Sequence, residues 1–73
     1  MAELSESERW RRVVDVLLAE ARRLGDPAAR ARKLIEVGDV WSSRLADAQR
    51  ASACYLDAVG IDPAVDEAAL GRL

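Results

Sequence analysis

The sequence has 73 residues, which is enough for one small domain, and its 11 basic and 13 acidic residues give a net charge of −2. The two signs are interspersed, so the chain lacks the basic stripe that is typical of proteins binding nucleic acid. No apolar run approaches the roughly 18 residues of a membrane span. We therefore expect neither nucleic acid nor a membrane as a partner.

The residues that usually carry catalysis are scarce. The sequence contains no histidine, which excludes histidine-based acid–base catalysis and histidine zinc sites. The single cysteine, Cys54, cannot form a disulfide within one chain, and it fits a reducing cytoplasm. We predict that Cys54 is buried and inert, and that the protein is cytoplasmic, is not an enzyme, and has no catalytic residues, cofactor or metal.

The first predicted helix spans residues 6–24. Ser5 and Glu8 have the spacing of a capping box at its start. Apolar residues then recur at intervals of three and four, which is the period of an amphipathic helix. The apolar positions are Trp10, Val13, Val14, Leu17, Leu18, Ala21 and Leu24.

The second predicted helix spans residues 27–44. Gly25 can take the left-handed conformation after the first helix, Asp26 can cap the second, and Pro27 suits its first position. Its apolar residues cover a wide arc, which is typical of a helix that packs against two neighbours. We therefore place this helix between the other two.

The third predicted helix spans residues 48–60, with Asp47 as its N-cap. Gly60 can end this helix, and Pro63 cannot comfortably continue it. A short fourth helix is predicted over residues 64–72. No segment alternates with the two-residue period of a strand, so we predict an all-α protein.

In residues 28–62 and the proline that follows, large and small residues have the spacing of two antiparallel helices. They are Leu34, Val37, Gly38, Trp41, Ala51, Tyr55, Ala58 and Pro63. This pattern resembles one tetratricopeptide repeat (TPR). Leu34 stands where the family usually has an aromatic residue. The run Trp-Arg-Arg-Val-Val-Asp-Val-Leu-Leu at residues 10–18, followed by Gly-Asp-Pro at residues 25–27, is also similar to the tandem TPR arrays of high-GC delta-type bacteria. The resemblance implies a single TPR-like domain over residues 1–73. This domain would be an α-solenoid fragment built from antiparallel helical hairpins. It would have three main helices, with a TPR-like hairpin over residues 27–60, and a short C-terminal helix.

Two sets of residues follow from this interpretation. The predicted core comprises Leu34, Val37, Gly38, Trp41, Ala51, Tyr55 and Ala58. The predicted interface comprises Trp10, Val14, Leu17, Leu18, Ala21, Val65, Leu70 and Leu73. We expect the interface because a repeat leaves an apolar face for its neighbour to cover.

The expected function is protein–protein interaction or self-assembly through exposed helix faces, with a homo-oligomer as the first expectation. Two geometries are open: a two-fold dimer, which we prefer because it is the commonest symmetry of homo-oligomers, and a head-to-tail stack, which would mimic an array of repeats. The alternative function is a small adaptor or regulator that binds and modulates an enzyme. A mass that depends on concentration favours the first function, and a stoichiometric complex with one unrelated protein favours the second.

Overall fold

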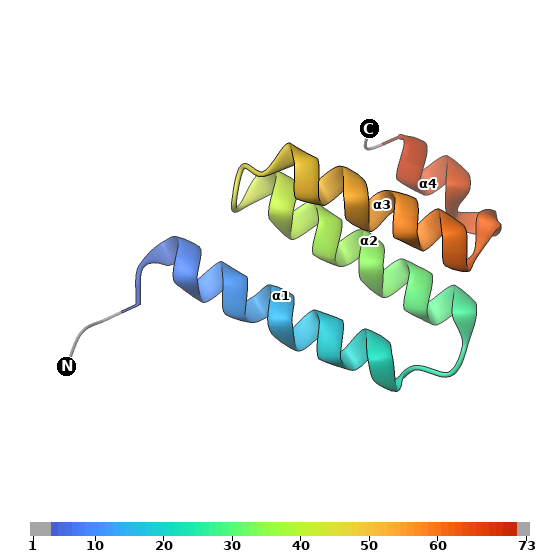
Figure 1. Ribbon diagram of the computed structural model, residues 1–73, viewed down its shortest axis with the longest axis horizontal. Coiled ribbons are helices and arrows are strands. Elements are labelled where there is room, and N and C mark those ends of the chain that lie inside the picture. Colours follow the sequence, from blue (N-terminus) through green and yellow to red (C-terminus); the bar gives the residue numbers. More distant parts are fainter. Residues whose placement is uncertain (1–3, 72–73) are drawn as a thin grey trace.

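The computed structural model describes residues 4–71, and for Leu70 it describes the backbone alone. The helices are α1 (Glu6–Arg23), α2 (Pro27–Ser43), α3 (Ala48–Ile61) and α4 (Asp66–Leu70), and a 3₁₀ turn, η1 (Pro63–Val65), precedes α4 (Figure 1). The described residues contain no strand. The prediction of an all-α protein is confirmed, and the ends of the three main helices fall within one residue of those expected from the sequence.

The three main helices begin at the residues that the sequence indicated. Ser5, Asp26 and Asp47 each use a side-chain oxygen to accept a hydrogen bond from the backbone amide three residues later, at 3.2, 3.2 and 3.0 Å. These bonds satisfy amide groups that have no partner inside the helix. Pro27 occupies the first position of α2, where a missing N–H costs nothing.

The turns are built differently from the prediction. Neither Gly25 nor Gly60 has a positive φ, and Gly60 lies inside α3, which ends at Ile61. The Leu24 carbonyl at the end of α1 instead accepts hydrogen bonds from the Arg30 guanidinium, at 3.3 Å from Nε and 2.8 Å from Nη2. The left-handed residue is Ala46, in the turn between α2 and α3, with a φ of 51°.

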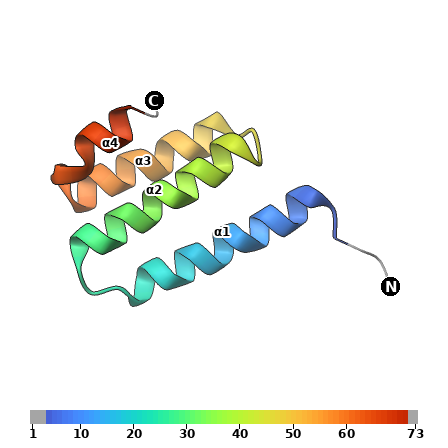
Figure 2. The same cartoon turned by 180° about the vertical axis from the view of Figure 1, so that it is seen from behind.

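Helix α2 lies between α1 and α3, as its wide apolar arc predicted. It packs against both, and the two opposite views show the same order (Figures 1 and 2). The Cα atoms extend over 45 × 26 × 12 Å, so the helices lie side by side in a flat layer that is little more than one helix thick. Helix α4 packs on α3, at the opposite edge of this layer from α1.

The core lies mainly between α2 and α3. Of the predicted core residues, Val37, Gly38, Ala51, Tyr55 and Ala58 are buried. Leu34 and Trp41 are only partly buried and pack against the edge of the core. The cluster is completed by Ala31, Ile35 and Ala69. Most of these residues are small, which lets the helix backbones approach closely.

Candidate interaction surface

Helix α1 is packed on one side only. Its buried residues, Val14 and Ala21, are 2% and 3% exposed, and α2 is the helix that α1 packs against. Both residues were predicted to contact another chain. The structure corrects that prediction, because the chain's own α2 already covers the centre of the apolar stripe.

Trp10 is also engaged within the chain. The Arg44 guanidinium lies 4.8 Å from the centroid of the Trp10 ring, which brings the end of α2 onto the start of α1. Such a cation–π contact stabilises by about 0.5–1 kcal/mol at an exposed site. Trp10, Leu17 and Leu18 remain half-buried, so the intrachain packing covers only part of the predicted interface.

The side of α1 opposite α2 carries an exposed valine among arginines. Val16 lies about 200° around the helix from the buried Val14, and 56% of it is exposed. Glu20 lies in the same sector of the helix, but its carboxylate is paired with Lys33 of α2. Arg9, Arg12 and Arg23 are exposed and also lie within about 60° of Val16 around the helix axis. We name these three arginines together with Val16 and Ala19 the α1 outer strip.

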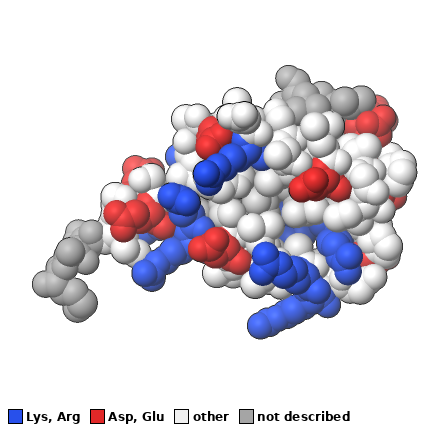
Figure 3. Space-filling model, viewed as in Figure 1, with Lys and Arg blue, Asp and Glu red and all other residues white. Residues whose placement is uncertain are grey.

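The arginines of the α1 outer strip are uncompensated. None of the three forms an ion pair with any residue in the part of the chain that the structure describes. Basic side chains project along the edge of the molecule that α1 forms, with acidic side chains among them (Figure 3). The strip is therefore a positively charged surface with an apolar centre.

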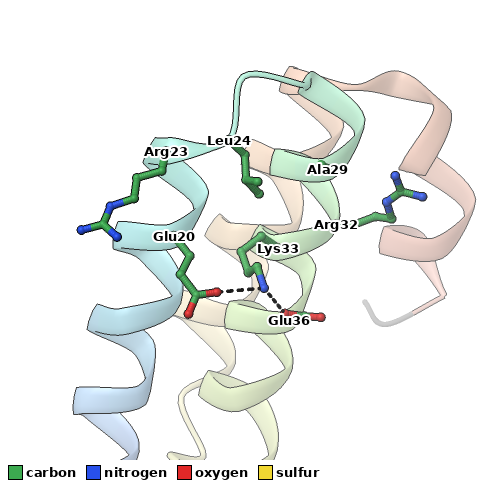
Figure 4. Close-up of a pocket in the computed structure, with 7 residues that line it drawn as sticks. All are labelled: Glu20, Arg23, Leu24, Ala29, Arg32, Lys33 and Glu36. Atoms are coloured by element: carbon green, nitrogen blue, oxygen red, sulfur yellow. Dashed lines mark ion pairs between the residues drawn. The ribbon is translucent and has the colours of Figure 1, made fainter.

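A shallow groove of about 530 Å³ runs between α1 and α2 (Figure 4). Its Lys33 ammonium lies 3.2 Å from a Glu20 carboxylate oxygen and 3.3 Å from one of Glu36. Hydrogen bonds to Glu20 and then Glu36 raise the pKa of Lys33 above its ordinary value. The charges in the groove are thus mutually paired, and Arg23 and Arg32 point away from it.

Two smaller hollows flank α1. One, of about 300 Å³, is lined by Leu18, Ala21, Arg22, Arg30 and Leu34. Its Arg30 is already bonded to the Leu24 carbonyl. The other, of about 410 Å³, is lined by Glu6, Arg9, Trp10 and Val13. Both are open surface depressions beside the packed side of α1.

Beyond these surfaces, few described side chains could act as a nucleophile or a metal ligand. Cys54 is half-buried, and burial, followed by the nearby Asp57 charge, raises the pKa of its thiol. A higher pKa leaves less of the nucleophilic thiolate at neutral pH. Residues 4–71 contain no cluster of side chains arranged to hold a metal ion. No helix within that range is both long enough and apolar enough to cross a bilayer.

Of the three C-terminal residues in the predicted interface, the structure describes the side chain of Val65 alone. Val65 is half-buried, because it packs against the core cluster. The Leu70 side chain and Leu73 lie outside the described residues. Asp66, Glu67 and Ala68, at the start of α4, are among the exposed positions at this end.

Sequence reasoning overlooked two exposed apolar residues. Val16 is 56% exposed and Leu56 is 61% exposed. Both fall outside the three-and-four spacing that picks out a buried stripe. An apolar residue at an off-stripe position was the signal that could have identified them, together with the arginines that surround Val16.

The chain matches no protein-family model, no curated protein and no solved structure. The resemblance to a tetratricopeptide repeat therefore stays a prediction. The function has to be argued from the surface of the molecule itself.

Proposed function

We propose that this protein is a non-enzymatic interaction module that associates with other copies of itself through the exposed side of α1. The observation that carries the proposal is the α1 outer strip, where Val16 is exposed between arginines that have no partner in the described chain.

The packing of the helices supports the same role. Among the described residues, α2 packs extensively against both α1 and α3, whereas the main packing partner of α1 is α2. Burying apolar surface contributes about 25 cal/mol per Å². A chain of this length buries a smaller fraction of its surface on folding than a larger domain does, so its free energy of unfolding is small. Covering the exposed side of α1 in a complex would add to that free energy. The resemblance to a tetratricopeptide repeat favours the same function, because such repeats stack on their neighbours.

The proposal is tested by the mass in solution, measured by light scattering across a dilution series. We expect the parent chain to associate, and we expect Val16→Glu to shift association to higher concentration. Leu56→Glu is the matched control, because Leu56 is an equally exposed apolar residue on α3. An assembly that Val16→Glu leaves unchanged would refute a role for α1.

The alternative is a small adaptor or regulator of an enzyme. That function would be favoured if the parent chain were monomeric at every concentration and formed a stoichiometric complex with one unrelated protein. The same α1 surface would then be the first place to map the contact, by testing whether Val16→Glu weakens that complex.

A further inference from the structure

The two halves of the chain carry opposite charge. Residues 6–44, which contain α1 and α2, have nine basic and seven acidic side chains and a net charge of +2. Residues 45–71, which contain α3 and α4, have one basic and five acidic side chains and a net charge of −4. Because α1 and α4 form opposite edges of the helical layer, the arginines of the α1 outer strip lie at one edge and Asp66 and Glu67 lie at the other, which we name the acidic edge.

The charge of the α1 outer strip argues against a two-fold dimer through that strip. Two such strips packed antiparallel around Val16 would bring Arg9 of one copy toward Arg23 of the other, because both residues lie seven positions from Val16. Like charges brought together at an interface oppose association and select against that partner. A strip of this composition fits a partner that is acidic with small or apolar side chains between the charges.

The acidic edge has that composition. Asp66 and Glu67 are exposed at the start of α4, beside the exposed Ala68 and the half-buried Val65. Neither carboxylate forms an ion pair within residues 4–71. The acidic edge is therefore available to another molecule, and it lies too far across the layer to reach the α1 outer strip of its own copy.

We propose that copies of this chain associate head to tail, with Asp66 and Glu67 of one copy against Arg12 and Arg23 of the next. This inference rests on the proposed function and specifies its geometry. Each copy uses both edges, so the contact is heterologous and repeats into a ring or an open chain. The charged pairs set the orientation, and the contact of Val16 with the small residues of α4 contributes the apolar burial.

Reversing the charge of one edge at a time tests the geometry. We expect Arg12→Glu/Arg23→Glu and, separately, Asp66→Arg/Glu67→Arg to weaken association by about tenfold or more, because each places like charges in contact. The control is Arg11→Glu/Arg22→Glu, which makes the same change of charge on the same helix at neighbouring exposed positions outside the strip. It should associate like the parent.

Mixing the variants gives the decisive result. In an equimolar mixture of the two double variants, every head-to-tail contact again joins opposite charges, so assembly should return. A chain with all four reversals should also assemble alone, which shows that the single-edge variants failed through charge and not through misfolding. Raising the salt concentration should weaken each of these assemblies.

The possible failures can be told apart. If Asp66→Arg/Glu67→Arg associates like the parent while Val16→Glu does not, the head-to-tail geometry is wrong and the α1 interaction stands. If neither the mixture nor the four-substitution chain assembles, the proposed pairing is also wrong. A parent chain that stays monomeric throughout overturns both this inference and self-association.

Discussion

The ring of Tyr55, in α3, lies directly against Gly38, in α2. A Cβ atom added at Gly38 would come within 2.8 Å of Tyr55 Cδ1 and 2.9 Å of Cζ. The ring cannot easily move aside, because only 2% of Tyr55 is exposed. The Tyr55 hydroxyl also donates a 2.7 Å hydrogen bond to Asp39 Oδ1, next to Gly38 in the chain.

This contact predicts that Gly38→Ala destabilises the fold by about 1–3 kcal/mol, through overpacking against a rigid ring. The loss should outweigh the roughly 1 kcal/mol that alanine normally gains over glycine in a helix. Gly60→Ala is the control, because nothing lies within 4 Å of a Cβ at that helical position. Urea denaturation should show Gly60→Ala equal to the parent or slightly more stable. Equal losses in both variants would contradict the account.

The Tyr55 hydroxyl predicts a second effect. Tyr55→Phe keeps the ring and removes the hydrogen bond to Asp39, so we expect a loss of about 1–2 kcal/mol in the free energy of unfolding. Tyr55→Ala also removes the buried ring and should cost about 3–5 kcal/mol. A double-mutant cycle of Tyr55→Phe with Asp39→Ala isolates the pair. Strictly additive losses in that cycle would mean that the bond contributes nothing.

The left-handed backbone of Ala46 predicts a stabilising substitution. A side chain at positive φ costs roughly 1–2 kcal/mol, and glycine avoids that cost. After allowing for the greater freedom of glycine in the unfolded chain, Ala46→Gly should stabilise the fold by up to about 1 kcal/mol. Ala53→Gly, an exposed position inside α3, should instead destabilise by about 1 kcal/mol. A lower melting temperature for Ala46→Gly would show that the turn is built differently.

The environment of Cys54 predicts a pH dependence. Because burial raises the pKa of its thiol, the folded chain should react with a disulfide reagent more slowly than the urea-unfolded chain at pH 8. The difference should narrow as the pH rises and the thiolate forms in both states. A folded-state rate that matches the unfolded rate at pH 8 would show that Cys54 is accessible and unperturbed.

Local features of this fold were predictable from the sequence, and contacts between distant segments were not. Ser5, Asp26 and Asp47 cap their helices because each cap needs only the following turn. The wide apolar arc of α2 correctly placed it in the middle. By contrast, the stacking of Arg44 on Trp10 joins residues far apart in the chain.

The candidate surface was predicted less well, for a physical reason. Helical periodicity identifies an apolar stripe, but it does not say how much of that stripe a neighbour covers. Val14 and Ala21 therefore looked like interface residues, although α2 buries them. Val16 lies off the stripe, and its off-stripe position was a signal of exposure that the search for a buried stripe passed over.

The most direct test of the central claim, that α1 binds a second copy of the chain, is the mass of the parent protein measured by light scattering at low salt over a wide dilution series. The account predicts a mass well above the 8.0 kDa of one copy at high micromolar concentration, falling toward that value on dilution. A mass of 8.0 kDa at every concentration would contradict it.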